Sequence, residues 1–179
     1  VPEGVDLIDV LGILGHVGIT AYVGVLEVAK PQPGEVFCVS AAASSVGSVA
    51  GQIAKMHGAT VIGIAGSADK CAWVVDDLGF DACSDYKRED VAARLKELAP
   101  KGVDIFFDNV GGELLDTVLR RIAMKARVVL CGDISTYNLD VPVPPFHNIR
   151  YLMGKRARME GFNTLDYWDH YADAASELA

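Results

Sequence analysis

The stretch that decides the fold runs from residue 36 to residue 70 and reads VFCVSAAASSVGSVAGQIAKMHGATVIGIAGSADK. Residues 36–41 form a short apolar run rich in β-forming residues, and residues 46–58 show helical periodicity that ends on a glycine. Residues 60–66 are typical of a second strand. A strand, a helix and a further strand in this order predict a βαβ unit, in which the two strands run parallel.

The same alternation continues through most of the chain. Further strands are expected at 81–86, 103–110, 126–132 and 156–163, and helices at 7–14, 19–28, 68–79, 89–102, 112–125 and the C-terminal end. Continuous apolar strands separated by helices indicate parallel pairing with both sheet faces covered. Right-handed crossovers then place the helices on the two faces, as in a doubly wound sheet. The sequence therefore predicts an α/β fold with a doubly wound, mostly parallel sheet of about six strands, a Rossmann fold.

The turn after the first strand has the spacing of a dinucleotide-binding turn but few of its glycines. Where such turns read GxGxxG, residues 42–47 read AASSVG, so only Gly47 remains, although the other glycine positions hold small residues. Ligands of doubly wound sheets bind beyond the carboxyl ends of the strands. We expect the amides of Val46 and Gly47 at the helix start to face a phosphate, with Ser44 or Ser45 as a hydroxyl donor. The alternative is a small-residue turn without a ligand.

The end of the second predicted strand favours NADP over NAD. NAD-preferring sites place an acidic residue there, about 20 residues after the glycine turn, to bind the ribose hydroxyls. Residues 64–67 read IAGS and contain no acid, whereas Lys70 follows one helical turn later and supplies charge for a 2′-phosphate. Asp69 argues mildly against this, unless it points outward at the helix start. The alternative for Lys70 is a solvated helix face.

Composition limits the remaining classes of function. The chain has 179 residues, enough for one domain, and its formal net charge of −8 argues against nucleic-acid binding. No apolar run reaches the roughly 18 residues needed to span a bilayer. Four cysteines lie far apart and form no CxxC motif, which favours reduced thiols in a cytoplasmic protein: Cys38, Cys71, Cys83 and Cys131.

The chain ends suggest a larger protein. The sequence begins without Met, and its last residues, 166–179, read as a helix that stops in mid-course. We therefore expect residues 1–179 to be a dinucleotide-binding domain excised from a longer chain.

Six segments resemble the medium-chain dehydrogenase/reductase superfamily, in its zinc-independent branch of prostaglandin reductases (leukotriene B4 12-hydroxydehydrogenases) and bacterial NADP-dependent alkenal and curcumin reductases. These segments are GHVGITAYVGVLE (15–27), AAASSVGSVAGQIAK (41–55), GSADK (66–70), DNVGG (108–112), CGDISTYN (131–138) and RMEGF (158–162). They occur in the family's order and spacing and cover most of the chain. Ser44 departs from the pattern, because this branch usually has glycine at that position.

The resemblance implies a role for each matching position. Ser44 to Gly47 would hold the pyrophosphate, and Lys70 the 2′-phosphate. Tyr86 would lie at the adenosine end, and Asn109 near a ribose. The nicotinamide half would be lined by Cys131, Gly132, Ile134, Ser135, Thr136 and Tyr137, with Phe162, Asn163 and Thr164 near the nicotinamide and the dimer edge. Structural roles without a ligand stay open as alternatives: Tyr86 as a strand cap, Asn109 as a turn residue, and Ser135 to Tyr137 as ordinary loop residues.

The resemblance also implies the chemistry of the whole enzyme. NADPH would donate hydride to the β-carbon of an α,β-unsaturated carbonyl compound, an enone or alkenal, with Tyr137 or ordered water as the proton donor. The substrate pocket would lie against a GroES-like catalytic domain that precedes this one, and a C-terminal tail would follow. We expect a homodimer joined at the edge strands, with little activity in the isolated domain. The alternatives are an NADPH:quinone reductase and a non-catalytic NADPH-binding module.

Two other motifs are weaker. Tyr151 and Lys155 match the YxxxK dyad of short-chain dehydrogenases, in which lysine helps tyrosine to donate a proton. That family's N-terminal glycine motif is missing, and the Pro-rich loop upstream interrupts the long helix that should carry the dyad. Zinc is not expected either, because the histidines and cysteines are scattered rather than clustered.

Overall fold

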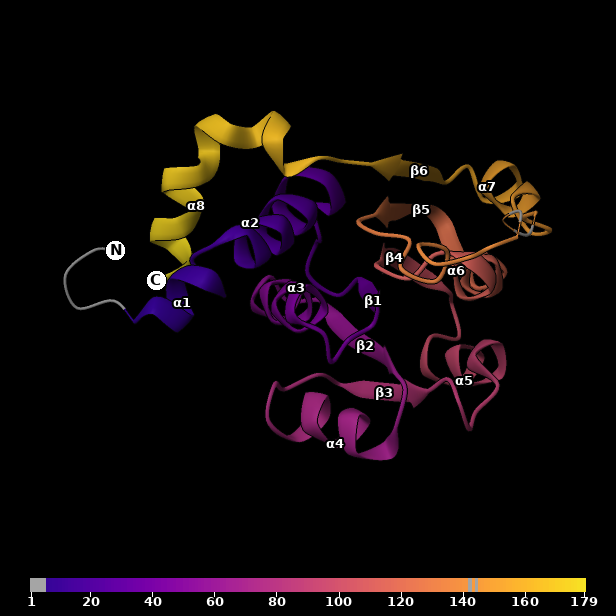
Figure 1. Cartoon of the computed structure of the whole chain (residues 1–179). Helices are drawn as coiled ribbons and strands as arrows, with labels where there is room; N and C mark the ends of the chain where they lie inside the picture. Colours follow the sequence, from indigo (N-terminus) through magenta and orange to yellow (C-terminus); the bar gives the residue numbers. More distant parts are fainter. Residues whose placement is uncertain (1–5, 142, 144) are drawn as a thin grey trace.

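Six parallel strands form a single sheet in the order β3-β2-β1-β4-β5-β6 (Figure 1). The computed structural model describes residues 6–141, 143 and 145–179, so residues 1–5 of the expected domain lie outside the described residues. The strands are β1 (Val36–Ser40), β2 (Thr60–Ala65), β3 (Ala82–Asp85), β4 (Val103–Asp108), β5 (Ile122–Leu130) and β6 (Arg158–Gly161). The predicted doubly wound fold is confirmed, and this strand order is that of the dinucleotide-binding sheet.

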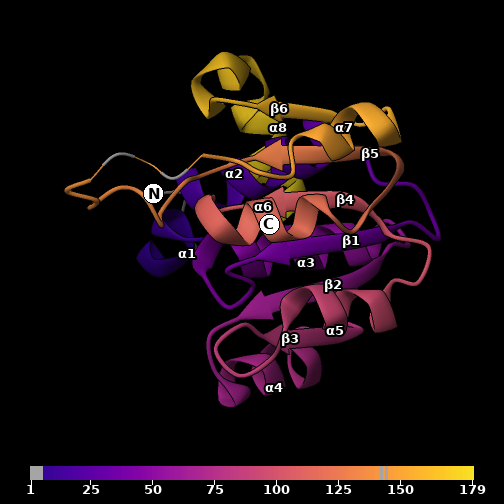
Figure 2. The ribbon, with the colours of Figure 1, turned by 90° about the vertical axis from the view of Figure 1, so that its right-hand side faces the viewer.

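Helices cover both faces of the sheet. They are α1 (Leu7–Leu11), α2 (His16–Tyr22), η1 (Val23–Ala29, a π-helix), α3 (Ser45–Met56), α4 (Ala68–Asp76), α5 (Val91–Leu98), α6 (Gly112–Leu119), α7 (Arg150–Lys155), η2 (Thr164–His170, 3₁₀) and α8 (Tyr171–Leu178). One core contains buried residues of α2, η1, α3 and α4, and the opposite core contains those of α5 and α6 (Figure 2). No helix in the described part of the chain combines the length and apolar character that crossing a bilayer requires.

The predicted boundary between the helix at 112–125 and the strand at 126–132 is wrong. The helix expected at 112–125 ends at Leu119, and the strand expected at 126–132 begins at Ile122 and ends at Leu130. Ile122 continues the apolar spacing of α6, which explains the error, but in the fold it pairs with Val103 of β4. Between that pair and the next, β4 advances by two residues and β5 by five, a bulge in which Lys125 has φ 62°. Pairing with β4 overrides the local helical pattern.

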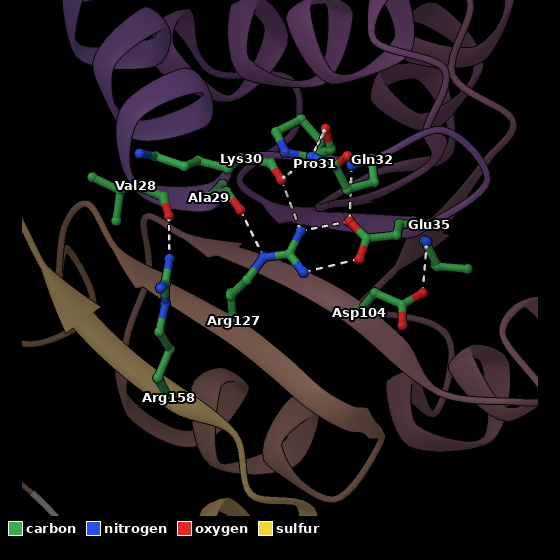
Figure 3. Close-up of polar contacts among 10 residues, drawn as sticks. Val28, Ala29, Lys30, Pro31, Gln32, Glu35, Asp104, Arg127 and Arg158 are labelled. Carbon is green, nitrogen blue, oxygen red and sulfur yellow. Dashed lines mark hydrogen bonds and ion pairs between the residues drawn. The ribbon is translucent and has the colours of Figure 1, made fainter.

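The N-terminal helical segment is fixed to the sheet by two arginines, Arg127 and Arg158, which are partners in the register of β5 and β6 (Figure 3). Arg127 of β5 donates from Nε to the Ala29 carbonyl at 2.6 Å and from Nη2 to the Lys30 carbonyl at 3.0 Å. Arg158 of β6 donates to the Val28 carbonyl at 2.6 Å. These carbonyls belong to the end of η1, where a helix cannot satisfy its own acceptors. The arginines therefore complete the end of η1 and hold it on the sheet.

Glu35 completes this cluster as the partner of Arg127. Arg127 Nη1 donates to Glu35 Oε1 at 2.9 Å, and the Gln32 amide donates to Oε2 at 2.9 Å. Burial by itself would raise the pKa of Glu35, but the hydrogen bonds from Arg127 and Gln32 outweigh it and lower the pKa below its usual 4.5. The carboxylate is thus favoured in the folded chain.

We predict that Arg127→Met destabilises the chain by about 2 kcal/mol. The substitution leaves Glu35 half-buried without its cation and removes donors from two carbonyls, although partial exposure of the pair reduces the cost below that of a fully buried one. Denaturant unfolding at neutral pH measures the difference. Arg94→Met is the matched control, because its pair with Glu97 is more exposed, and it should change the stability by no more than about 0.5 kcal/mol.

The effect of Arg127→Met should depend on pH with a definite sign. A carboxyl whose folded pKa is lowered stabilises the fold above its unfolded pKa, and this contribution disappears as the pH falls through the folded value. The gap between the parent chain and Arg127→Met should therefore shrink below about pH 4.5. A gap that widens in acid would show that Glu35 is not the partner that matters.

Candidate functional site

A cleft of about 510 Å³ lies at the carboxyl ends of the strands, within the size range of small-molecule sites. It is lined by segments that follow five of the strands, β1 to β5. Its lining residues are Ala41, Ala43, Ser44, Ala65, Gly66, Lys70, Tyr86, Lys87, Val110, Leu114, Ile134 and Ser135. The cleft spans the boundary between β1 and β4, where the strand order reverses and doubly wound sheets bind their ligands.

The start of α3 forms one wall of the cleft and lies close to the end of β1. A Cβ on Gly47 would stand 2.3 Å from the Ala41 carbonyl oxygen, so only glycine permits this approach. Ala41 itself has a left-handed φ of 49°. Ser44 caps the helix, because its Oγ accepts the Gly47 amide at 3.2 Å. The first-turn amides of Ser45 and Val46 remain as donors that the helix cannot satisfy, which suits an anion.

Two lysines give the opposite wall its charge. Lys70 comes from the first turn of α4, and Lys87 follows β3 beside Tyr86, with its Nζ 6.0 Å from the ring centroid. Tyr86 lies against Gly66, since a Cβ added to that glycine would be 3.0 Å from the ring. Among the residues that line the cleft there is no acid, and Asp69 is not among them. The chain is acidic overall, but this wall attracts anions.

A buried carboxylate organises the floor between β1 and β4. Asp108, fully buried at the end of β4, accepts the Ser40 hydroxyl at 2.7 Å and the amides of Val110 and Gly111 at 3.1 and 2.9 Å. Burial raises the pKa of Asp108, and these three hydrogen bonds oppose the rise. Asn109 donates its own amide to Ser40 Oγ at 2.8 Å and its side-chain amide to the Ser40 carbonyl at 2.9 Å.

The loop after β5 folds on itself beside a neighbouring hollow of about 410 Å³. Thr136 donates to the carboxylate and carbonyl of Asp133, and the Tyr137 hydroxyl accepts the Asp133 amide at 3.3 Å. Burial and the charge of Asp108 raise the pKa of the Cys131 thiol to about 12, so it is a neutral thiol near pH 7.

The structure brings together only part of the predicted site. Of the predicted residues, the cleft gathers Ser44, Lys70, Tyr86, Ile134 and Ser135, and the hollow gathers Cys131, Gly132 and Tyr137. The others are placed near the strand ends by α3 and by the loops: Ser45, Val46, Gly47, Asn109, Thr136, Phe162, Asn163 and Thr164. Their roles toward a ligand stay predictions.

Several predicted residues have structural contacts of their own. Phe162 packs on Phe107 with 6.5 Å between ring centroids, and Asn163 caps η2 by accepting the Leu165 amide at 3.0 Å. Thr164 is buried. Asn109 donates its side-chain amide to the Ser40 carbonyl at the end of β1, a contact that neither the cofactor role nor the turn alternative predicted, and its amide oxygen is not used in that bond.

Sequence reasoning assigned no role to several residues of the site, among them Lys87, Gly66, Ser40 and Asp108. Lys87 directly follows the predicted Tyr86, so its positive charge was a usable signal. Gly66 stood in the quoted GSADK segment without being assigned a role. For Ser40 and Asp108 the sequence carries no signal of contact, because they are 68 residues apart and meet only through strand pairing.

The weaker motifs lie elsewhere. Tyr151 and Lys155 occupy the six-residue α7, and Tyr151 packs against the α5–α6 core rather than lining the cleft. Within the described ranges, no three His, Cys, Asp or Glu side chains gather closely enough to hold a metal ion.

Comparisons with known proteins identify relatives of this fold and cleft. The family model described as "Zinc-binding dehydrogenase" matches residues 45–179. A 2-alkenal reductase (NADP(+)-dependent) of Nicotiana tabacum is 47% identical over 161 residues, which are 89% of this chain and 47% of the relative. CurA of Vibrio vulnificus, solved in complex with NADPH, superposes with a TM-score of 0.89 at 40% identity over 96% of this chain and 52% of its own.

A quinone oxidoreductase of Escherichia coli, solved in complex with NADPH, superposes less closely, with a TM-score of 0.77 at 28% identity over 90% of this chain and 49% of its own. The chain spans about half the length of the curated relatives it matches.

We predict that Gly47→Ala destabilises the chain by roughly 2–3 kcal/mol. The added Cβ would meet the backbone carbonyl of Ala41 at 2.3 Å, so α3 must move away from β1. Gly154→Ala is the matched control, because its Cβ meets nothing within 4 Å in helix α7, and it should be neutral or stabilise by up to about 1 kcal/mol. Equal effects of the two substitutions in thermal unfolding would contradict the close approach.

Proposed function

The chain belongs to the zinc-binding dehydrogenase family, in the zinc-independent branch of the medium-chain dehydrogenase/reductases, and on this premise we propose that it is the NADPH-binding domain of an enone or alkenal reductase. One observation carries the proposal: the cleft at the strand-order reversal joins a helix start that suits a pyrophosphate to a wall with two lysines. Its relatives include a reductase named as NADP-dependent and a CurA solved with NADPH.

The residues of the cleft fit a dinucleotide with an additional phosphate. In our proposal the first turn of α3 holds the pyrophosphate through the amides of Ser45 and Val46 and the hydroxyl of Ser44, while Gly47 lets the helix start lie close to the end of β1. Lys70 binds the 2′-phosphate, and Tyr86 lies at the adenosine end. The lining supports NADP over NAD, because β2 ends in Ala65 and Gly66 where an acid would repel the 2′-phosphate.

The nicotinamide half of the cofactor would reach the segments after β4, β5 and β6. Asn109, Cys131 to Tyr137 and Phe162 to Thr164 are the residues proposed to hold it. When bound, NADPH supplies the hydride that the reaction transfers. The chain orients the cofactor and keeps water away, and catalysis then depends mainly on position.

The proposed reaction reduces the C=C bond of an α,β-unsaturated carbonyl compound. Hydride adds to the β-carbon, and the negative charge that develops on the carbonyl oxygen needs donors aimed at it. The α-carbon then takes a proton. Tyr137 is our candidate proton donor, although its hydroxyl already accepts the Asp133 amide.

Quinone reduction by the same fold is the second candidate function, supported by the likeness to a quinone oxidoreductase. A non-catalytic NADPH-binding module is the third candidate function.

The proposal extends to the whole protein. A substrate-binding domain of the GroES-like type and a C-terminal tail would complete it, in keeping with relatives about twice as long. Strand β6 lies at one edge of the sheet. Edge strands tend to pair, which supports a homodimer formed through β6. A cytoplasmic location is also proposed, and the cysteines of the described chain are free thiols.

We predict that Lys70→Ala weakens NADPH binding by about 10- to 100-fold and leaves NADH binding within about twofold. The loss corresponds to one charge-assisted hydrogen bond to a phosphate that NADH lacks. Fluorescence titrations with both nucleotides measure the two dissociation constants. Lys101→Ala is the matched control, because it removes the same charge outside the cleft. Equal losses for NADPH and NADH would remove the assignment of Lys70.

The substrate class is tested on the full-length protein. We expect kcat/KM for an alkenal to exceed that for a quinone by at least about tenfold, because both reactions share the hydride donor and differ in the acceptor that the pocket fits. Consumption of NADPH followed at 340 nm gives both values. Faster turnover of the quinone would favour the second candidate, and NADPH binding without turnover of either substrate would favour the third.

A further inference from the structure

Two thiols lie next to each other behind the lysine wall of the cleft, and the proposed function uses neither. Cys71 of α4 and Cys83 of β3 have their Sγ atoms 2.7 Å apart. Both are partly exposed, whereas Cys38 is completely buried in β1. Twelve residues separate them in sequence, and the return of the chain from α4 to β3 brings them together.

The sheet leaves room for this contact. Cys83 pairs with Gly63 of β2, and a Cβ on Gly63 would already stand 3.3 Å from the Cys83 sulfur. Glycine at that position therefore lets the Cys83 side chain lie over the sheet surface, toward the helix that covers it. Cys71, in the second turn of α4, meets it there. The pair is thus fixed by backbone elements on both sides.

The two thiols open to solvent through a shallow hollow of about 360 Å³. Besides the cysteines, it is lined by Ala72, Val75, Asp76, Asp81, Ala82 and Arg94. A small oxidant or a thiol reagent can therefore reach the pair without passing through the cleft. Arg94 is the cation in this lining, and Asp76 and Asp81 are its acids.

We propose that Cys71 and Cys83 form a reversible disulfide that fastens α4 to β3, with hydroperoxides as the class of oxidant. One thiolate attacks the peroxide oxygen and becomes a sulfenic acid, while the peroxide leaves as an alcohol or water. The second thiolate attacks the sulfenic sulfur, the S–S bond forms, and the sulfenic oxygen leaves as water. Two thiols and one hydroperoxide thus give a disulfide, an alcohol or water, and one water. Two molecules of a free thiol such as glutathione reverse the bond by exchange through a mixed disulfide, and they leave as their own disulfide.

The surroundings of the two thiols determine their pKa and therefore the rate of this oxidation. Burial raises the pKa of both thiols, and the charges of Asp85 and Glu89 raise that of Cys71 further. Asp76, Asp81 and Arg94 line the same hollow, where Asp81 forms an ion pair with Lys55. The thiolate is therefore scarce near pH 7. We expect oxidation over minutes to hours, and faster oxidation as the pH rises.

The bridge would restrain the lysine wall of the cleft from both α4 and β3. Cys71 directly follows Lys70, and Cys83 lies three residues before Tyr86, and both neighbours line the cleft. A disulfide between α4 and β3 restricts the unfolded chain and stops α4 from opening separately. This consequence concerns stability, so it holds or fails independently of the proposed cofactor.

The test uses a favourable cleavage pattern. Trypsin cuts after Lys70 and Lys87, so both cysteines fall in one peptide, residues 71–87. The folded chain is treated with hydrogen peroxide, and free thiols are alkylated after denaturation. The masses of the tryptic peptides are then measured by mass spectrometry. We expect this peptide to lack alkyl groups and to have lost two hydrogens, while Cys38 and Cys131 are alkylated. The bridged chain should unfold roughly 5–10 °C higher than the reduced chain, and dithiothreitol should reverse both changes.

Single-thiol variants provide the controls. Cys71→Ala and Cys83→Ala keep a small side chain and should each lose the gain in midpoint that peroxide gives the parent. Two alkyl groups on peptide 71–87, after a treatment that oxidises dithiothreitol completely, would overturn the proposal. A bridged chain with no higher midpoint than the reduced chain would overturn the fastening of α4 to β3.

Discussion

The hydrogen bonds between Ser40 and Asp108 hold the sheet together at the point where its strand order reverses. There β1 and β4 are neighbours, but the helices that follow them, α3 and α6, lie on opposite faces. The chain therefore leaves the sheet in two directions, and the backbone amides of the turn after β4 have no strand to pair with. Asp108 accepts two of these amides and the Ser40 hydroxyl, and so satisfies buried groups that are costly when left unpaired. The hydrogen bonds between Ser40 and Asp108 thus form the floor of the cleft between the ends of β1 and β4.

The two ends of the strands have different tasks. At the amino ends, Arg127 and Glu35 form a half-buried ion pair that closes the end of η1 and holds the N-terminal helices to the sheet. At the carboxyl ends, the chain instead presents a left-handed Ala41, a close contact at Gly47 and amides without helical partners. Such features cost stability locally, and they are the features that an anion can use. The end closed by Arg127 and Glu35 thus lies opposite the end that carries the cleft.

The charge of the cleft differs in sign from the net charge of the chain. The chain has a net charge of −8, yet the cleft collects Lys70 and Lys87 and, among its lining residues, no acid. Local charge in a recessed site determines which ligand enters, and the overall charge concerns solubility and non-specific contacts. The thiols of Cys71 and Cys83 lie directly behind this wall, where burial raises the pKa of both and keeps them protonated. The lysine wall of the cleft and the thiol pair therefore share helix α4 and strand β3.

Sequence by itself determined that about six strands form a mostly parallel sheet, because apolar runs alternating with amphipathic helices leave few other ways to bury both faces. It also placed Ser44, Lys70 and Tyr86 in one cleft, since residues that follow parallel strands meet at the same end of the sheet. Only the tertiary structure decided where β5 begins, because Ile122 suits the period of α6 as well as a place beside Val103. It alone joined Ser40 to Asp108 and Cys71 to Cys83, and it gave Asn109 a structural partner. The physical reason is that local periodicity records which face of an element is buried, whereas contacts between distant residues depend on strand register and on the path of the chain.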